Sequence, residues 1–219
     1  MLKVHHLSNS RSQRILWLLE ELDLDYELVL HPRDPVTVRS PESLFKIHPL
    51  GKGPTIEHDG GALPESGAII DFVTRKLAGG RLSVPESSPE FSDYLFWLLY
   101  AEGSAMGPVV FDLLDGMTGG GCGEALRGFY LNEVKHSFDF MENVLSRQEP
   151  FLASGFTAAD INMTWVLELS EPCGHLEAHP RMTAYLRRMQ ARPAYARAMQ
   201  KGGRQDLTMF RPAQPLPLT

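Results

Sequence analysis

The chain has 219 residues, of which 43% are hydrophobic and 22% are charged. This composition suits one large or two small folded domains, and it excludes a mostly disordered protein. The formal net charge is −6 and no cluster of Lys and Arg stands out, which argues against nucleic acid as a partner.

The first 30 residues predict a strand, a helix and a second strand. Apolar residues alternate over residues 2–6 and again over 26–30, as they do in strands with one buried face. Between these segments, over residues 11–22, leucine and isoleucine recur at helical spacing. Two strands joined through a helix pair in parallel, so we expect the chain to begin with a βαβ unit.

The following fifty residues complete the pattern of a small α/β domain. The predicted elements are a proline-rich loop at 32–41, a short helix at 41–46, strands at 55–58 and 62–63, and a helix at 66–77. Asp59-Gly60-Gly61 is a hairpin signal because glycine accepts positive φ, and Gly79-Gly80 ends the last helix. The order βαβαββα is that of a thioredoxin-like domain, which we place at residues 1–80.

Beyond residue 80 no segment predicts a strand. Residues 81–89 are rich in Ser, Pro and Glu and lack an apolar period, so we interpret them as a linker. A first, long helix is predicted from residue 90 onward, and further helices are predicted at 124–145, 158–170, 180–191 and 193–200. Gly107-Pro108 should kink or interrupt the first of them, because proline has no amide donor. We therefore expect an all-α helical bundle at 90–203 and a tail at 204–219.

The cysteines and histidines do not form a known metal-binding pattern. Cys122 and Cys173 are the only cysteines, and the eight histidines have no ligand spacing, so we expect reduced thiols and no metal. The sequence contains no run of 18 apolar residues and no signal-peptide pattern. We therefore expect a cytoplasmic protein that has no membrane partner.

Three short stretches allow both a structural and a chemical interpretation. Ser10 and Gln13 fit an S-x-x-Q capping box, but a hydroxyl at a helix N-terminus also suits hydrogen bonding to a thiolate. Pro54 begins a strand and either marks a sheet edge or, in the cis form, turns the preceding backbone toward a ligand. Glu65 and Ser66 either cap their helix or hold the ammonium and carboxylate groups of a ligand.

In their order and spacing these stretches resemble the glutathione transferase family over nearly the whole chain. The matching landmarks are the serine turn with Arg14 four residues after Ser10, His48-Pro49-Leu50-Gly51-Lys52-Gly53-Pro54, Glu65-Ser66, and Phe156-Thr157-Ala158-Ala159-Asp160-Ile161. The turn is similar to that of serine-type, theta- or zeta-like enzymes of bacterial character, because no Tyr or Cys lies near it. The last landmark is a capping box, which we interpret as structural.

The resemblance implies that Ser10 donates a hydrogen bond to the thiolate of glutathione. Ser8 and Asn9 lie in the same turn and stay open as alternative donors. The implied reaction is attack on an electrophile by conjugation, peroxide reduction or halide displacement, as in detoxification. The implied partners are glutathione as co-substrate, a small hydrophobic electrophile and a second copy of the chain in a homodimer.

The resemblance also implies the other contacts with glutathione. They are Gly53 before a cis-Pro54 for the cysteinyl unit, Glu65 and Ser66 for the γ-glutamyl end, Lys52 and His48 for the glycine carboxylate, and Asn9 in the serine turn. Two of these positions depart from the family pattern. Gly53 replaces the usual branched residue, and His48 replaces the usual asparagine.

Two other functions compete with a transferase. A binding or regulatory protein of the same fold would use Ser10 only to cap its helix. A disulfide oxidoreductase would need a C-x-x-C motif near residue 10, which the chain lacks. Retention on immobilised glutathione together with turnover of a generic aryl halide would distinguish an enzyme from a binding protein.

Overall fold

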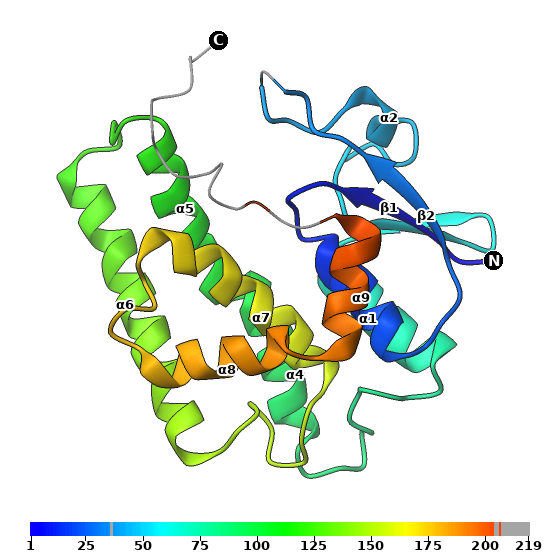
Figure 1. Ribbon diagram of the computed structural model, residues 1–219. Helices are drawn as coiled ribbons and strands as arrows, with labels where there is room; N and C mark the ends of the chain where they lie inside the picture. Colours follow the sequence, from blue (N-terminus) through cyan, green and yellow to red (C-terminus); the bar gives the residue numbers. More distant parts are fainter. Residues whose placement is uncertain (36, 204–205, 207–219) are drawn as a thin grey trace. The chain divides into compact units, whose positions relative to one another are not determined.

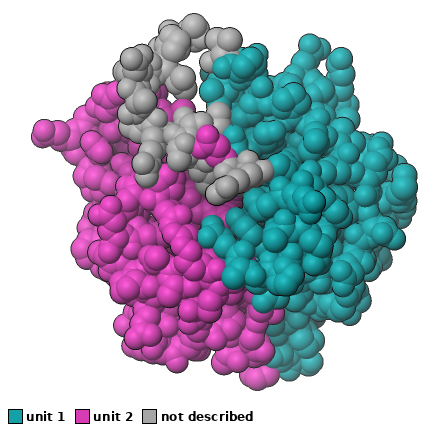
Figure 2. Space-filling view, viewed as in Figure 1, with its two compact units in different colours: residues 1–88, 190–205 teal, residues 89–189, 206–219 magenta. Residues whose placement is uncertain are grey.

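The computed structural model describes residues 1–35, 37–203 and 206, and its helices and strands are drawn in Figure 1. The chain forms two compact units, which are coloured separately in Figure 2. The first unit contains residues 1–88 and the segment that begins at Gln190, and the second contains residues 89–189. The first is a thioredoxin-like α/β domain and the second is all-helical, as the sequence predicts. The first boundary between the units, between Ser88 and Pro89, lies inside the predicted linker.

The first unit is built on one four-stranded sheet. Its elements are β1 (Lys3–Leu7), α1 (Gln13–Glu21), β2 (Glu27–His31), α2 (Glu42–Phe45), β3 (Thr55–His58), β4 (Gly61–Pro64), α3 (Ser66–Phe72) with a π-helical continuation (Val73–Leu77), and α9 (Pro193–Gly202). The strand order is β2-β1-β3-β4, in which β1 and β2 are parallel and the other two pairs are antiparallel. The predicted order βαβαββα is therefore confirmed.

The contacts of two adjacent histidines show which helices cover each face of this sheet. Successive residues of a strand point to opposite faces. The ring of His6 lies 2.8 Å from the hydroxyl of Ser12, just before α1. The ring of His5 lies 2.9 Å from that of His31, which contacts Ser43 of α2 at 2.8 Å. Helix α1 therefore lies on one face of the sheet and α2 on the other.

Helix α9 packs along α1 within the first unit (Figure 1), although the sequence analysis placed residues 190–203 in the helical domain. Arg197 and Lys201 of α9 pair with Glu20 of α1 at 3.0 and 2.5 Å. Arg192 pairs with Glu21 at 2.6 Å. A helical apolar period identifies a buried face but not the surface that covers it, so no sequence pattern separates α9 from the preceding helices.

The second unit consists of helices. They are α4 (Phe91–Tyr100), a π-helical segment (Ala101–Ala105), α5 (Met106–Met117), α6 (Glu124–Arg147), α7 (Ala158–Ser170), a 3₁₀ turn (Glu171–Cys173) and α8 (Pro180–Gln190). The predicted break at Gly107-Pro108 takes the form of the π-helical segment directly before it, since proline cannot donate its amide to the preceding turn. No helix among the described residues is long and apolar enough to cross a membrane. Except for residue 206, the predicted tail lies outside the described residues.

Helix α7 begins with the predicted capping box. The amide and hydroxyl of Thr157 donate to one carboxylate oxygen of Asp160 at 2.8 and 3.2 Å. The other oxygen accepts from the Tyr185 hydroxyl at 2.7 Å and from the Phe151 amide at 3.3 Å. Burial raises the pKa of Asp160, although these hydrogen bonds oppose the increase. All these partners are protein groups of the second unit, so the motif is structural.

Candidate active site

The turn between β1 and α1 holds Ser10 against the end of the strand. Its hydroxyl donates to the carbonyl of Leu7 at 2.8 Å, and its oxygen accepts from the amide of Ser12 at 3.2 Å. The predicted capping box between Ser10 and Gln13 is wrong, because α1 begins at Gln13 and the N-cap residue Ser12 makes no side-chain capping bond. The side-chain amide of Gln13 is buried and has no hydrogen-bond partner within the described part of the chain. Ser10 therefore closes the turn instead of capping the helix.

Gly53 and Pro54 lie against this turn. The Gly53–Pro54 peptide bond is cis, as the resemblance implies. A Cβ atom at Gly53 would stand only 2.7 Å from Cβ of Leu7 and 3.6 Å from Oγ of Ser10. This lack of space explains the glycine at a position where the family usually has a branched residue. Because glycine has no side chain, the backbone of Gly53 can lie close to the Ser10 hydroxyl.

The start of α3 lies beside the same loop. Pro64 pairs with Thr55 across β3 and β4, so Glu65 and Ser66 follow directly beside the cis-proline loop. Glu65 has φ +76° and ψ +120°, a backbone conformation that costs a non-glycine residue about 1–3 kcal/mol. Its side chain is exposed and makes no capping bond, and Ser66 is buried. The first amides of α3 have no partner inside the helix, so they are available to an anion.

Known proteins of one family are similar to this chain over most of its length. The sequence matches the family models of the glutathione S-transferase N-terminal domain at residues 10–76 and of its C-terminal domain at residues 123–188. Glutathione S-transferase 3 of Schizosaccharomyces pombe is 32% identical, over 96% of this chain and 91% of its own length. The chain belongs to the glutathione S-transferase family. It is therefore a transferase.

Solved structures have the same fold as this transferase. The crystal structure of a glutathione S-transferase from Actinobacillus pleuropneumoniae is 28% identical, with a TM-score of 0.88 over 97% of this chain and 98% of that one. A sphingomonad glutathione S-transferase complexed with glutathione is 22% identical, with a TM-score of 0.73 over 92% and 99% of the two chains. At that level of identity, the second structure shows a common fold alone.

Arg33 fixes the serine turn of this transferase, and the sequence analysis missed it. Its guanidinium donates to the carbonyls of Ser8 at 2.9 Å, Asn9 at 3.0 Å and Val38 at 2.8 Å. Asn9 has φ +51°, in the left-handed region that asparagine tolerates better than most residues. Burial, together with the nearby charge of Arg11, lowers the pKa of Arg33 from its ordinary value. An arginine in a proline-rich loop carries no sequence signal for this role.

Ser12 and His6 lie next to Ser10 and were also missed as site residues. The Ser12 hydroxyl lies 2.8 Å from Ser10 Oγ, 3.0 Å from the Leu7 carbonyl and 2.8 Å from Nδ1 of His6. Burial lowers the pKa of His6 from 6.5 to about 4, against an opposing backbone hydrogen bond with Gly202. His6 is therefore neutral near pH 7. Ser12 is placed to satisfy the Leu7 carbonyl when Ser10 donates elsewhere.

Lys52 and His48 lie in the loop that leads to the cis-proline. The side chain of Lys52 is exposed, and its carbonyl accepts from the Thr55 hydroxyl at 2.8 Å. His48 is partly buried, and its Nδ1 accepts from the amide of Leu50 at 3.3 Å. In a neutral ring the proton then resides on Nε2, which is left as a donor. Both side chains therefore offer donors suited to a carboxylate.

Proposed function

We propose that this enzyme binds glutathione where the serine turn, the cis-proline loop and the start of α3 meet, and that Ser10 stabilises the thiolate. The observation that carries the proposal is the proximity of Ser10 and Gly53, because it puts a hydroxyl next to the backbone that would bind the cysteinyl unit. Membership of the glutathione S-transferase family supports the choice of ligand. The sphingomonad enzyme of the same fold, complexed with glutathione, supports it further.

The surrounding residues match the remaining groups of the tripeptide. The exposed carboxylate of Glu65 would pair with the γ-glutamyl ammonium, and Ser66 with the amides that begin α3 would hold the adjacent carboxylate. Lys52 and His48 would contact the glycine carboxylate through charge-assisted hydrogen bonds. Asn9, in the serine turn, would contact the substrate near its sulfur.

One hydroxyl is enough to change the ionisation of the thiol. A hydrogen bond to a charged group contributes about 1.5–3 kcal/mol, so Ser10 would lower a thiol pKa near 8.5 by about one to two units. The thiolate fraction at neutral pH then increases from a few per cent to roughly a half. The thiol proton leaves to solvent. The thiolate then adds to an electrophilic carbon, or displaces halide from carbon, or attacks a peroxide oxygen with release of an alcohol; in the last case a second glutathione reduces the sulfenic acid, which gives the disulfide and water.

Ser10 must release the carbonyl of Leu7 in order to donate to sulfur, because a serine hydroxyl has one proton. Ser12 lies 3.0 Å from the same carbonyl and would take over this hydrogen bond by turning its own single proton from Nδ1 of His6 to Leu7. The N-terminus of α1, three residues after Ser10, would add a favourable dipole. The serine turn thus has an arrangement that supports the exchange of partners.

Substitution of Ser10 by alanine tests the proposal. The pKa of bound glutathione, followed by thiolate absorbance, should rise by about one unit or more, and kcat near neutral pH should fall about tenfold. Ser8→Ala is the matched control and should keep the parental pKa. A pH profile of Ser10→Ala that overlays that of the parent would contradict the assignment and point to Asn9 or Ser8 as the donor.

We further propose that the enzyme is a cytoplasmic homodimer that acts in detoxification. Three apolar side chains of the first unit, Leu30, Phe45 and Leu50, are 57%, 55% and 50% exposed. These side chains would lose exposed apolar surface if a second copy packed on them. Light scattering should report twice the chain mass of 24.5 kDa, and a monomer mass would contradict the dimer.

A further inference from the structure

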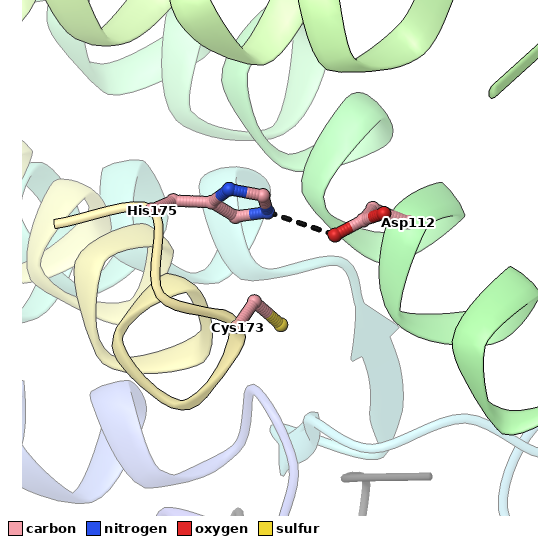
Figure 3. A group of neighbouring side chains, drawn as sticks. All are labelled: Asp112, Cys173 and His175. Carbon is pink, nitrogen blue, oxygen red and sulfur yellow. Dashed lines mark ion pairs between the residues drawn. The ribbon is translucent and has the colours of Figure 1, made fainter. Parts of the chain in front are cut away.

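Three side chains of the second unit with different ligand chemistry converge at one point. Asp112 comes from the middle of α5, Cys173 ends the 3₁₀ turn after α7, and His175 follows two residues later (Figure 3). Their ligand atoms all lie within 4.8 Å of one another. The ring Nε2 of His175 is 3.0 Å from a carboxylate oxygen of Asp112.

The backbone after α7 aims Cys173 and His175 in a common direction. Gly174 between them has φ +81°, a left-handed conformation that reverses the chain and that glycine adopts without strain. The amide of His175 donates to the carbonyl of Ser170 at 3.3 Å. The ring of His175 packs edge-on against Phe138, with centroids 6.0 Å apart. The positions of both side chains are thus set by their local fold.

Polar atoms at this point are shielded from solvent but incompletely bonded. Nε2 of His175, Oδ1 of Asp112 and Oδ2 of Asp115 have no hydrogen-bond partner in the part of the chain that the structure describes. Nε2 of His175 forms an ion pair with Oδ2 of Asp112, and this partner lowers the pKa of the Asp112 carboxyl. The two carboxylate oxygens without a hydrogen bond form ion pairs with the Arg127 guanidinium, at 3.7 Å from Oδ1 of Asp112 and 3.8 Å from Oδ2 of Asp115. Buried polar atoms of this kind are costly, and a bound ion is one of the explanations for them.

We propose that Asp112, Cys173 and His175 form a binding site for one thiophilic divalent cation, of which Zn²⁺ is the representative. A thiolate, an imidazole and a carboxylate are the ligand types that zinc takes, whereas Mg²⁺ and Ca²⁺ prefer oxygen ligands alone. Binding replaces the thiol proton, which is released to solvent. The +2 charge of the ion then balances the thiolate and the carboxylate.

The observed spacing requires only small side-chain movements to reach zinc geometry. Zinc binds sulfur at about 2.3 Å and nitrogen or oxygen at about 2.0–2.2 Å, so ligand atoms around one ion stand about 3–4 Å apart. The side chains of Asp112 and His175 are 11% and 13% exposed, which leaves the site shielded but open to an ion. Three protein ligands leave a fourth tetrahedral position for water or a substrate atom, as in catalytic zinc sites.

The sequence predicts no metal site, because no common motif joins these three residues. Cys173 and His175 are separated by a single residue, a spacing that no common zinc motif has. The third ligand lies far away in sequence, on a different helix. Only the packing of α5 against α7 brings it to the other two.

Cobalt substitution tests the site directly and needs neither glutathione nor activity. The full-length, untagged protein is freed of metal with a chelator and titrated with Co²⁺ and then with Zn²⁺ against a chromophoric chelator. We expect one equivalent of each ion, and a thiolate-to-cobalt charge-transfer band. Cys173→Ser should abolish that band. Asp112→Asn and His175→Gln each change a direct ligand, so they should weaken zinc binding by at least about 10–100-fold, which is the cost of losing a residue that only hydrogen-bonds to a ligand.

Cys122→Ser is the matched control, because Cys122 is the other cysteine of the chain and its amide donates to Asp115 at 3.1 Å. It should keep both the band and the zinc affinity. Far-UV circular dichroism in excess chelator establishes that each variant is folded. Absence of the band from the parent protein, or its persistence in Cys173→Ser, would overturn the proposal. Absence of the band from the parent needs no variant, so it overturns the proposal even where Cys173→Ser fails to fold.

Discussion

Substitution of Gly53 by alanine would show how closely the cis-proline loop must approach the serine turn. The added Cβ would lie 2.7 Å from Cβ of Leu7 and 3.4 Å from its amide nitrogen. Carbon atoms in contact normally lie about 3.5–4.0 Å apart, so the structure must move by about 1 Å. Cβ of Leu7 is attached to the backbone of β1 and cannot rotate away. Overpacking of this kind costs about 1–3 kcal/mol, which we expect as the loss in free energy of unfolding.

Denaturant unfolding and steady-state kinetics measure the two consequences for Gly53→Ala. Because the backbone of Gly53 would bind the cysteinyl unit, its displacement should raise KM for glutathione as well as lower stability. Gly61→Ala is the matched control in β4, where the nearest atom to an added Cβ is the carbonyl oxygen of His58 at 3.7 Å. We expect the control to change stability by no more than about 0.5 kcal/mol. If Gly53→Ala were as stable as the control and had an unchanged KM, the reasoning would be refuted.

Ser66→Ala should raise KM for glutathione more than it lowers kcat, because the γ-glutamyl end is bound alike in ground and transition states; an unchanged KM would leave Ser66 with a structural role alone. His6 has a folded pKa lowered from 6.5 to about 4, so its contribution to stability is complete above pH 6.5 and is lost as the pH falls toward 4. At about 1.4 kcal/mol per pKa unit, the parent should lose about 3 kcal/mol of unfolding free energy over this pH range. Denaturant unfolding of His6→Asn should show no such loss. Parallel pH curves for parent and variant would exclude His6 as its source. Asp160→Ala removes the capping box and the partner of Tyr185 and Phe151, so it should cost about 2 kcal/mol or more in unfolding free energy and leave kcat per folded molecule unchanged. An unfolding midpoint equal to that of the parent would contradict this role.

The sequence predicted the elements and landmarks that depend on interactions between residues close together in the chain. Strand alternation and helical period predicted the βαβαββα order of the first unit and the helices from residue 90 onward, because burial of one face imposes those periods. The capping box of Thr157 and Asp160 was predictable because its groups lie within four residues. The resemblance further implied the cis bond at Gly53–Pro54, which the structure has. The capping box of Ser10 and Gln13 failed, because the hydroxyl of Ser10 bonds back to Leu7 instead.

Contacts between distant segments were decided by the tertiary structure alone. Arg33 reaches the carbonyls of Ser8 and Asn9, and α9 pairs with α1 through Glu20 and Glu21. Asp112 likewise meets His175 only because α5 and α7 pack together. A sequence pattern reports which face of an element is buried and which groups lie a few residues apart. It carries no signal for which distant surface covers that face, and so the partners of Arg33, α9 and Asp112 became known only from the fold.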